Sequence, residues 1–166
     1  MAENKHNIYF DCRKEKGWTR DKACDLLKEI SVDRLERIEN NRANPEPYEV
    51  TIMAEAYKKS QLCNYYCTHD CAIGRKYMPE IKIKDLSQIV LETLASLNSI
   101  EEKKNRLIEI TVDGKIEGDE LKDFIQIKNE LDKISIAIDS LKLWVEQKKA
   151  DGSINESEYK EVEENL

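Results

Sequence analysis

The sequence has few residues that interrupt helices, since its 166 residues include only five glycines and three prolines. Aromatic side chains make up 7% of the chain, whereas Asp, Glu, Lys and Arg together make up 37%. The stretches between the glycines and prolines have the length and the apolar spacing of helices, so little chain is left for a sheet. We therefore predict an all-α protein.

Long apolar runs and clustered catalytic residues are also missing. No segment approaches the roughly 20 apolar residues that span a bilayer, and the first residues, MAENKHN, lack the pattern of a secretory signal. The chain has two histidines, no glycine-rich phosphate loop and no nucleophile elbow. We expect a cytoplasmic protein that enters no membrane, is not an enzyme and needs no cofactor.

Positive charge is scarce for a nucleic-acid-binding protein, because the whole chain carries a net charge of −7. Residues 1–60 hold 12 Lys/Arg and 12 Asp/Glu and have no net charge. Residues 61–166 hold 15 Lys/Arg and 22 Asp/Glu and therefore carry the whole net charge of −7. An acidic C-terminal part is unfavourable next to a phosphate backbone. If the protein binds DNA, the first sixty residues are the part that does so.

Four short helices are predicted in this first part, over residues 7–16, 19–27, 31–40 and 47–59. Gly17 follows the first helix, and Thr19 and Ser31 are N-cap residues for the second and third. In the third helix only Leu35 and Ile38 form an apolar pair, so its other face must meet something polar.

The runs RKEKGWT (residues 13–19), SVDRLERIEN (31–40), the loop N-x-x-x-N-P (40–45) and MAEAY (53–57) resemble lambda-repressor-like regulators of the Xre/Cro class. The resemblance covers about residues 7–60. It implies a helix-turn-helix domain whose third helix, residues 31–40, enters the major groove of double-stranded DNA, in a homodimer. One departure is the turn before the third helix, where LKEIS (residues 27–31) is one residue longer than the family pattern and lacks its glycine.

The same resemblance assigns roles to individual side chains. Arg34 corresponds to a base-reading position and would contact a guanine, with Val32 on a thymine methyl and Asp33 on a cytosine. Arg20, Arg37, Asn41 and Arg42 would hold phosphates. The predicted DNA-binding residues are Arg20, Ser31, Val32, Asp33, Arg34, Arg37, Asn41 and Arg42.

A run of three cysteines follows the fourth helix. Cys63, Cys67 and Cys71 recur every fourth residue, and His69 lies among them, which raises the possibility of a metal or redox site. On one continuous helix, however, the outer two lie about eight residues × 1.5 Å, or roughly 12 Å, apart. Structural zinc sites use two separate ligand pairs, so we favour burial and predict no metal site. Metal binding by Cys63, Cys67, His69 and Cys71, or thiol redox sensing, remains the alternative.

Two long helices are predicted in the acidic part, over residues 82–110 and 119–149, joined as an antiparallel hairpin. A hairpin leaves part of each apolar stripe without a partner, so we expect dimerisation there. The predicted organisation is thus a DNA-binding domain (1–61), a cysteine-containing connector (62–80) and a helical hairpin (81–166).

The joints at residues 113–120 and 151–158 share the pattern D-G-x-I-x-x-x-E, which matches the second half of a calcium-binding loop. A lysine at a ligand position, Lys149, excludes calcium from the second copy. We instead expect the glycine to end one helix, with Asp119 or Ser157 near the start of the next.

A repressor that reads DNA through residues 31–40 is the predicted function. Because Asp33 and Glu36 lie on the outer face of the third helix, the first alternative is a protein-interaction adaptor that kept the fold and lost DNA affinity. The second alternative is the cysteine-based sensor.

Overall fold

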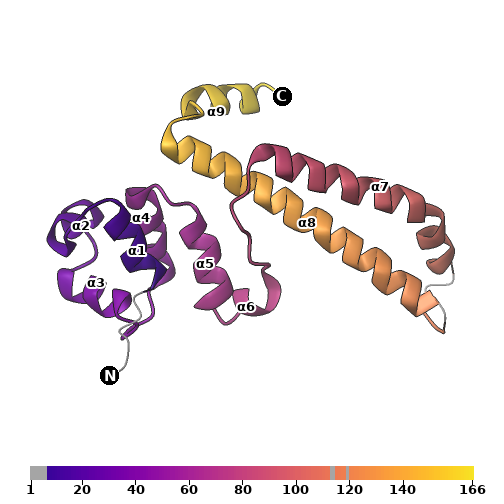
Figure 1. Cartoon of the computed structure of the whole chain (residues 1–166), viewed down its shortest axis with the longest axis horizontal. Helices are drawn as coiled ribbons and strands as arrows, with labels where there is room; N and C mark the ends of the chain where they lie inside the picture. The colour runs from indigo at the N-terminus through magenta and orange to yellow at the C-terminus, as the bar shows by residue number, and fades with distance from the viewer. Residues whose placement is uncertain (1–6, 113–114, 119) are drawn as a thin grey trace. The chain divides into compact units, whose positions relative to one another are not determined.

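Figure 1 shows the computed structural model of the chain, which describes residues 7–112, 115–118 and 120–166. Every regular element in those ranges is a helix, which confirms the all-α prediction. None of these helices is long and apolar enough to cross a membrane. The helices are α1 (Ile8–Glu15), α2 (Arg20–Leu27), α3 (Val32–Glu39), α4 (Pro47–Tyr57), α5 (Gln61–His69), α6 (Gly74–Tyr77), α7 (Leu86–Ile110), α8 (Glu120–Asp151) and α9 (Glu156–Glu164).

The chain divides into two compact units. Unit 1 comprises Met1–Glu80 and Val145–Leu166, and unit 2 comprises Ile81–Trp144. The predicted boundaries differ from this division, because residues 62–80 and the end of the chain belong with the N-terminal helices.

Side-chain caps start the first three helices where the sequence indicates. The Asn7 side chain accepts a hydrogen bond from the Phe10 backbone at 3.3 Å, and Thr19 accepts one from Lys22 at 3.2 Å. Ser31 accepts one from the Arg34 backbone at 3.2 Å. Each cap satisfies an N–H group that has no partner within its own helix, which fixes where the helix begins.

The core of unit 1 is formed by apolar side chains from α1 to α5. Ala23 and Leu27 of α2 are buried in it, whereas Cys24 is only half-buried. The fully or nearly fully buried members are Tyr9, Cys12, Ala23, Leu27, Ile30, Leu35, Ile38, Val50, Met53, Ala54, Tyr57 and Leu62.

Helix α5 is a structural part of this core rather than a connector. Leu62 is completely buried, and the Tyr65 ring meets the Tyr9 ring edge-on with centroids 6.0 Å apart. At the end of α5, the Tyr9 hydroxyl donates to an Asp70 carboxylate oxygen at 2.7 Å. These contacts tie α5 to α1 across sixty residues of sequence, which explains why the first compact unit extends beyond residue 61.

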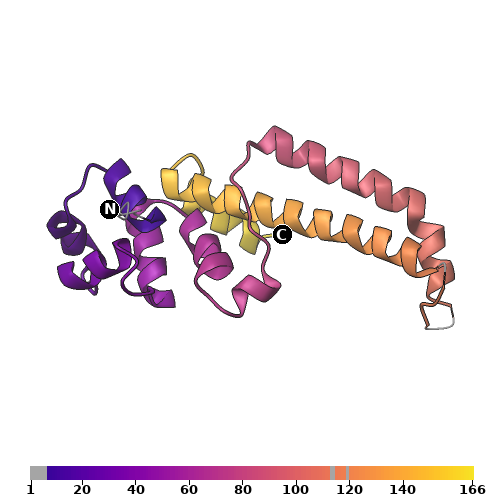
Figure 2. The same ribbon diagram turned by 60° about the horizontal axis from the view of Figure 1, so that its bottom comes forward.

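Unit 2 contains the predicted hairpin. Helices α7 and α8 lie side by side and run in opposite directions (Figures 1 and 2). Ion pairs Arg106–Asp123 at 2.7 Å and Lys103–Glu130 at 3.9 Å join them near the hairpin end. The buried residues of the hairpin include Ile89 and Ile110 on α7 and Ile127 and Ala137 on α8.

Helix α8 ends at a glycine as expected, since Gly152, with φ +83°, directly follows its last residue. Ser157 is the second residue of α9, near its start as predicted. The cap is Asn155, whose side chain accepts hydrogen bonds from the Ser157 and Glu158 backbones at 3.0 and 3.3 Å. The Lys149 ammonium lies 4.1 Å from the centre of the Tyr159 ring. In the first joint, Asp113, Gly114 and Asp119 lie outside the described residues, and with them the expected start at Asp119.

Candidate nucleic-acid interface

Helices α2 and α3 are joined by a four-residue turn, residues 28–31, that replaces the missing glycine with a strained residue. Lys28 has φ 53° and ψ −44°, and the Glu29 backbone N–H donates to the Leu27 carbonyl at 2.5 Å. This is a γ-turn with a positive φ, a conformation that non-glycine residues rarely adopt. Ile30, 2% exposed, anchors the turn in the core.

The inner face of α3 is fixed by apolar contacts and by a buried carboxylate. Leu35, Ile38 and Glu39 are all completely buried. Two hydrogen bonds from the Arg13 guanidinium reach Glu39, at 2.5 and 2.7 Å, and a third reaches the Trp18 carbonyl at 2.6 Å. A buried charge is tolerated when it is paired and hydrogen-bonded in this way.

Arg20 joins the same cluster instead of pointing to solvent. Its Nε atom donates to a Glu39 carboxylate oxygen at 2.8 Å, and its Nη1 atom lies 3.9 Å from Glu36. The Arg20 side chain is 27% exposed. Helix α3 is therefore attached to α1 and α2 through one carboxylate and two guanidinium groups.

A second ion pair attaches α3 to α4. The Arg34 guanidinium donates to both carboxylate oxygens of Glu49 at 2.7 Å and to the Asn44 carbonyl at 2.9 Å. Glu49 also accepts from the Glu46 backbone at 2.7 Å and is 2% exposed. Burial raises the pKa of Glu49, but the hydrogen bonds from Arg34 and from the Glu46 backbone outweigh it, so the pKa lies below its ordinary value.

The outer face of α3 carries predicted site residues that are exposed to solvent. Val32, Asp33 and Arg37 are exposed, as is Arg42 in the following loop. Neither Arg37 nor Arg42 forms an ion pair within the ranges that the structure describes. Ser31 is exposed too, but its hydroxyl caps α3.

Asn41, at the end of α3, is oriented by the first helix. The Asn7 side-chain amide donates to the Asn41 side-chain oxygen at 2.9 Å and to the Ile38 carbonyl at 2.7 Å. Asn41 itself has φ 56°, so the chain turns sharply there. This arrangement fixes the loop that carries Arg42.

The structure thus places the predicted residues of α2 and α3 in two different environments. Val32, Asp33 and Arg37 lie together on one exposed face, whereas Arg20 and Arg34 are held by Glu39 and Glu49. The two buried carboxylates were not predicted from the sequence. Their signal is a glutamate directly beside an inward-facing apolar residue, Glu39 after Ile38 and Glu49 before Val50.

The cysteine segment is not assembled into a ligand cluster. Within the described ranges, no three His, Cys, Asp or Glu side chains are placed so that they could hold a metal ion. The His69 ring instead stacks on Tyr65 with centroids 4.1 Å apart, and the Cys71 sulfur accepts from the Gly74 backbone at 3.4 Å.

Burial also raises the pKa of Cys63 and of Cys67, so both thiols stay protonated near neutral pH. Because the thiolate is the reactive form, this environment suits packing better than redox chemistry. Gly74 lies against Cys67 so closely that an added Cβ atom would be 2.0 Å from the Cys67 carbonyl oxygen.

Comparison of the chain with known protein families, with curated proteins and with solved structures gives no match. The functional assignment therefore depends on the arrangement of these side chains.

Proposed function

We propose that the protein is a sequence-specific DNA-binding regulator of transcription, a cytoplasmic repressor that inserts α3 into the major groove. The observation that carries this proposal is the asymmetry of α3. Its inner face is fixed by Leu35, Ile38 and the Arg13–Glu39 and Arg34–Glu49 pairs, whereas its outer face is exposed and polar. A short helix held rigidly by one side suits recognition of base edges by the other.

The exposed side chains supply the chemistry for reading bases. Val32 suits a thymine methyl group, Asp33 can accept from the amino group of cytosine, and the Arg37 guanidinium matches the two acceptors of guanine. Arg42 and Asn41 are suited to phosphate contacts, which set the register on the duplex. In this proposal Arg20 and Arg34 act as positioning residues, because their guanidinium groups already bind Glu39 and Glu49.

Dimerisation through unit 2 would supply affinity that an electrically neutral reading domain lacks. The hairpin exposes large apolar side chains at helical spacing on both helices, a patch of the kind that marks an interface. Among them are Leu86, Val90, Leu94 and Leu97 on α7 and Leu131, Ile138 and Leu141 on α8. A two-fold dimer then presents two α3 helices to two half-sites about one helical turn apart.

The test is selection of random double-stranded DNA by the full chain at low salt, followed by binding titrations over a range of salt concentrations. We expect a palindromic sequence and an affinity that falls steeply with salt, because phosphate contacts release counterions. The variant Leu94→Glu/Ile138→Glu should be monomeric and bind a single half-site as the native protein does, while losing affinity for the palindrome. Failure to enrich any sequence at low salt would overturn the proposal.

One observation favours a second candidate, a protein-interaction adaptor. Asp33 and Glu36 place two carboxylates on the outer part of α3, and residues 1–60 carry no net charge. Carboxylates near phosphates oppose DNA binding. If the selection enriches nothing, stoichiometric capture of a protein through α3, abolished by Asp33→Lys, would establish this role instead.

A further inference from the structure

The tip formed by α6 exposes apolar and basic side chains together. Ile73, Tyr77 and Met78 are 72%, 69% and 48% exposed. Arg75 and Lys76 lie between them in sequence, and the Lys76 ammonium is 5.0 Å from the centre of the Tyr77 ring. Neither cation forms a salt bridge within the described part of the chain. We call residues 73–78 the α6 tip.

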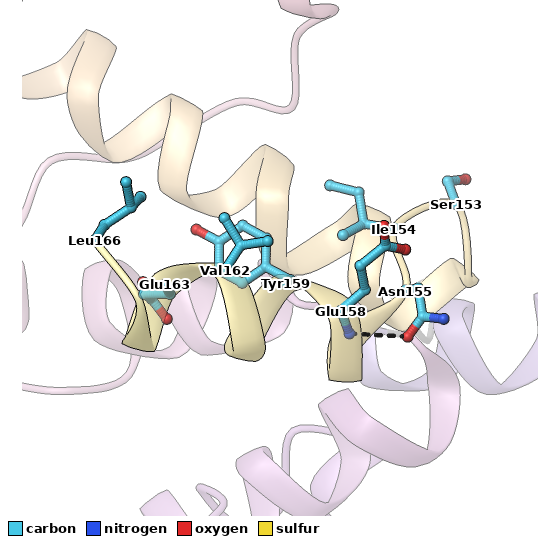
Figure 3. Close-up of a pocket in the computed structure, with 8 residues that line it drawn as sticks. All are labelled: Ser153, Ile154, Asn155, Glu158, Tyr159, Val162, Glu163 and Leu166. Carbon is cyan, nitrogen blue, oxygen red and sulfur yellow. Dashed lines mark hydrogen bonds between the residues drawn. The ribbon is translucent and has the colours of Figure 1, made fainter.

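A groove along α9 has the opposite charge. It encloses about 490 Å³ and is lined by residues 153–166 alone. Figure 3 shows Ile154, Tyr159, Val162 and Leu166 pointing to the same side of the helix. Val162 is 56% exposed and Leu166 is fully exposed, so this apolar side has little cover.

Carboxylates flank the apolar floor of the α9 groove. Glu158 and Glu163 both line it, and neither is in a salt bridge within the residues that are described. Over residues 156–166 the chain has five glutamates and one lysine. One face of the Tyr159 ring already carries the Lys149 ammonium, which shows that a cation is accommodated beside this floor.

Like charge disfavours pairing of either surface with its own copy. Two α9 grooves would bring glutamates together, and two α6 tips would bring Arg75 and Lys76 together. The α6 tip and the α9 groove, however, match in both respects, since apolar side chains meet an apolar floor and two cations meet two carboxylates.

We propose that the α6 tip of one copy of this chain docks in the α9 groove of a second copy. Tyr77 and Ile73 enter the floor between Tyr159 and Val162, and Arg75 and Lys76 pair with Glu158 and Glu163. The contact is heterologous, so a surface on each chain stays available for a further copy unless two chains pair reciprocally. Together with hairpin dimers it would join DNA-bound dimers into larger assemblies.

Such a contact is small and is expected to be weak by itself. Interfaces well below about 1,200 Å² are transient, with dissociation constants far above the nanomolar range. When two chains are held close together, on neighbouring DNA sites or in hairpin dimers, the effective concentration of the tip near the groove rises. A weak contact then becomes populated. The measurement must therefore reach high protein concentration.

The test is sedimentation velocity of the full chain at concentrations up to about 1 mM, where contacts of this size become populated. The tip variant Arg75→Glu/Lys76→Glu and the groove variant Glu158→Lys/Glu163→Lys should each weaken the concentration-dependent association about tenfold or more, since each brings like charges together. An equimolar mixture of the two variants should restore it, because the reversed tip then meets the reversed groove.

A matched control on the same helix is Glu161→Lys/Glu164→Lys, which makes the same change in charge at two exposed residues outside the groove. This variant should associate as the native chain does. Equal weakening by both α9 variants, no recovery in the mixture, or no association at the highest concentration would each overturn the proposal. Repeating the series in the Leu94→Glu/Ile138→Glu variant separates association through this contact from dimerisation through the hairpin. Because sedimentation is measured without DNA, the result does not depend on whether the protein binds DNA.

Discussion

Arg34 and Glu49 form a two-pronged ion pair, with both N···O distances 2.7 Å, between α3 and a nearly buried carboxylate on α4. Arg34→Ala is expected to lower the free energy of unfolding by about 2–3 kcal/mol, because Glu49 would remain buried without its cation. Arg37→Ala, on the exposed face of the same helix, should change it by less than about 0.5 kcal/mol. Urea denaturation of both variants measures this difference, and equal losses would contradict the positioning role of Arg34.

The same pair makes stability depend on pH. Because the folded-state pKa of Glu49 lies below its ordinary value of 4.5, its contribution is complete above that value and is lost as the pH falls through the lowered pKa. Glu49→Gln removes this contribution. The difference in unfolding free energy between the native chain and Glu49→Gln should therefore shrink between neutral pH and about pH 3. A difference that stays constant over this range would show that the carboxylate charge is not the cause.

Lys28 occupies a conformation that glycine adopts at far lower cost. Lys28→Gly should raise the free energy of unfolding by about 0.5–1 kcal/mol, as relief of the strain at φ 53° exceeds the added chain entropy. Lys22→Gly, in the first turn of α2, should instead lower it, by up to about 1 kcal/mol. Thermal or urea denaturation distinguishes the two signs. Destabilisation by both substitutions would mean that the γ-turn is not strained.

Two arginines on the proposed reading surface should affect DNA binding differently. Arg42→Ala is expected to weaken binding to all sequences and to reduce the slope of log affinity against log salt by about one, as loss of a phosphate contact does. Arg37→Ala should cost about 1–3 kcal/mol on the selected sequence only, which relaxes base preference. Titration of selected and scrambled duplexes tests this assignment. Identical behaviour of the two variants would refute it.

Gly74 leaves no space for a side chain beside the Cys67 carbonyl. Gly74→Ala places a methyl group 2.0 Å from that oxygen, so α6 must move away from α5, at an expected cost of about 1–3 kcal/mol. In Gly17→Ala the added methyl group meets no atom within 4 Å. This substitution should therefore lower the free energy of unfolding only by the cost of an alanine at φ +68°, about 1 kcal/mol. Urea unfolding curves compare the stability of the two variants, and the reactivity of Cys67 toward a thiol reagent reports on the local movement. Unchanged Cys67 reactivity in Gly74→Ala would contradict the expected movement.

Local signals in the sequence were sufficient for α1 to α4 and for α7 and α8, whereas α5 and α6 fall in the segment that was predicted to be a connector. Thr19 and Ser31 begin α2 and α3 because a hydroxyl beside free N–H groups acts within four residues, and apolar spacing predicts α7 and α8 to within a few residues. Contacts between residues far apart in the sequence could not be predicted in this way. The hydrogen bond from Tyr9 to Asp70, which assigns α5 to unit 1, joins residues that no short motif connects.

The direction of the arginines was the part of the candidate site that the sequence could not supply. Arg34 and Arg37 are three residues apart on one helix and chemically identical, so spacing alone does not say which of them faces protein. The decision depends on Glu49, fifteen residues further on. In the same way, nothing local to Arg20 indicates that Glu39 will be buried beside it.

The separation of inner and outer residues on α3 has a consequence for how this protein can change over evolutionary time. Val32, Asp33 and Arg37 contribute little to folding, whereas Arg13, Glu39, Arg34 and Glu49 fix the helix without facing outward. In the proposed role of α3, substitutions at the first three positions would therefore redirect recognition to a new target while the fold persists. A duplicated copy could diverge in what it recognises through two or three codon changes.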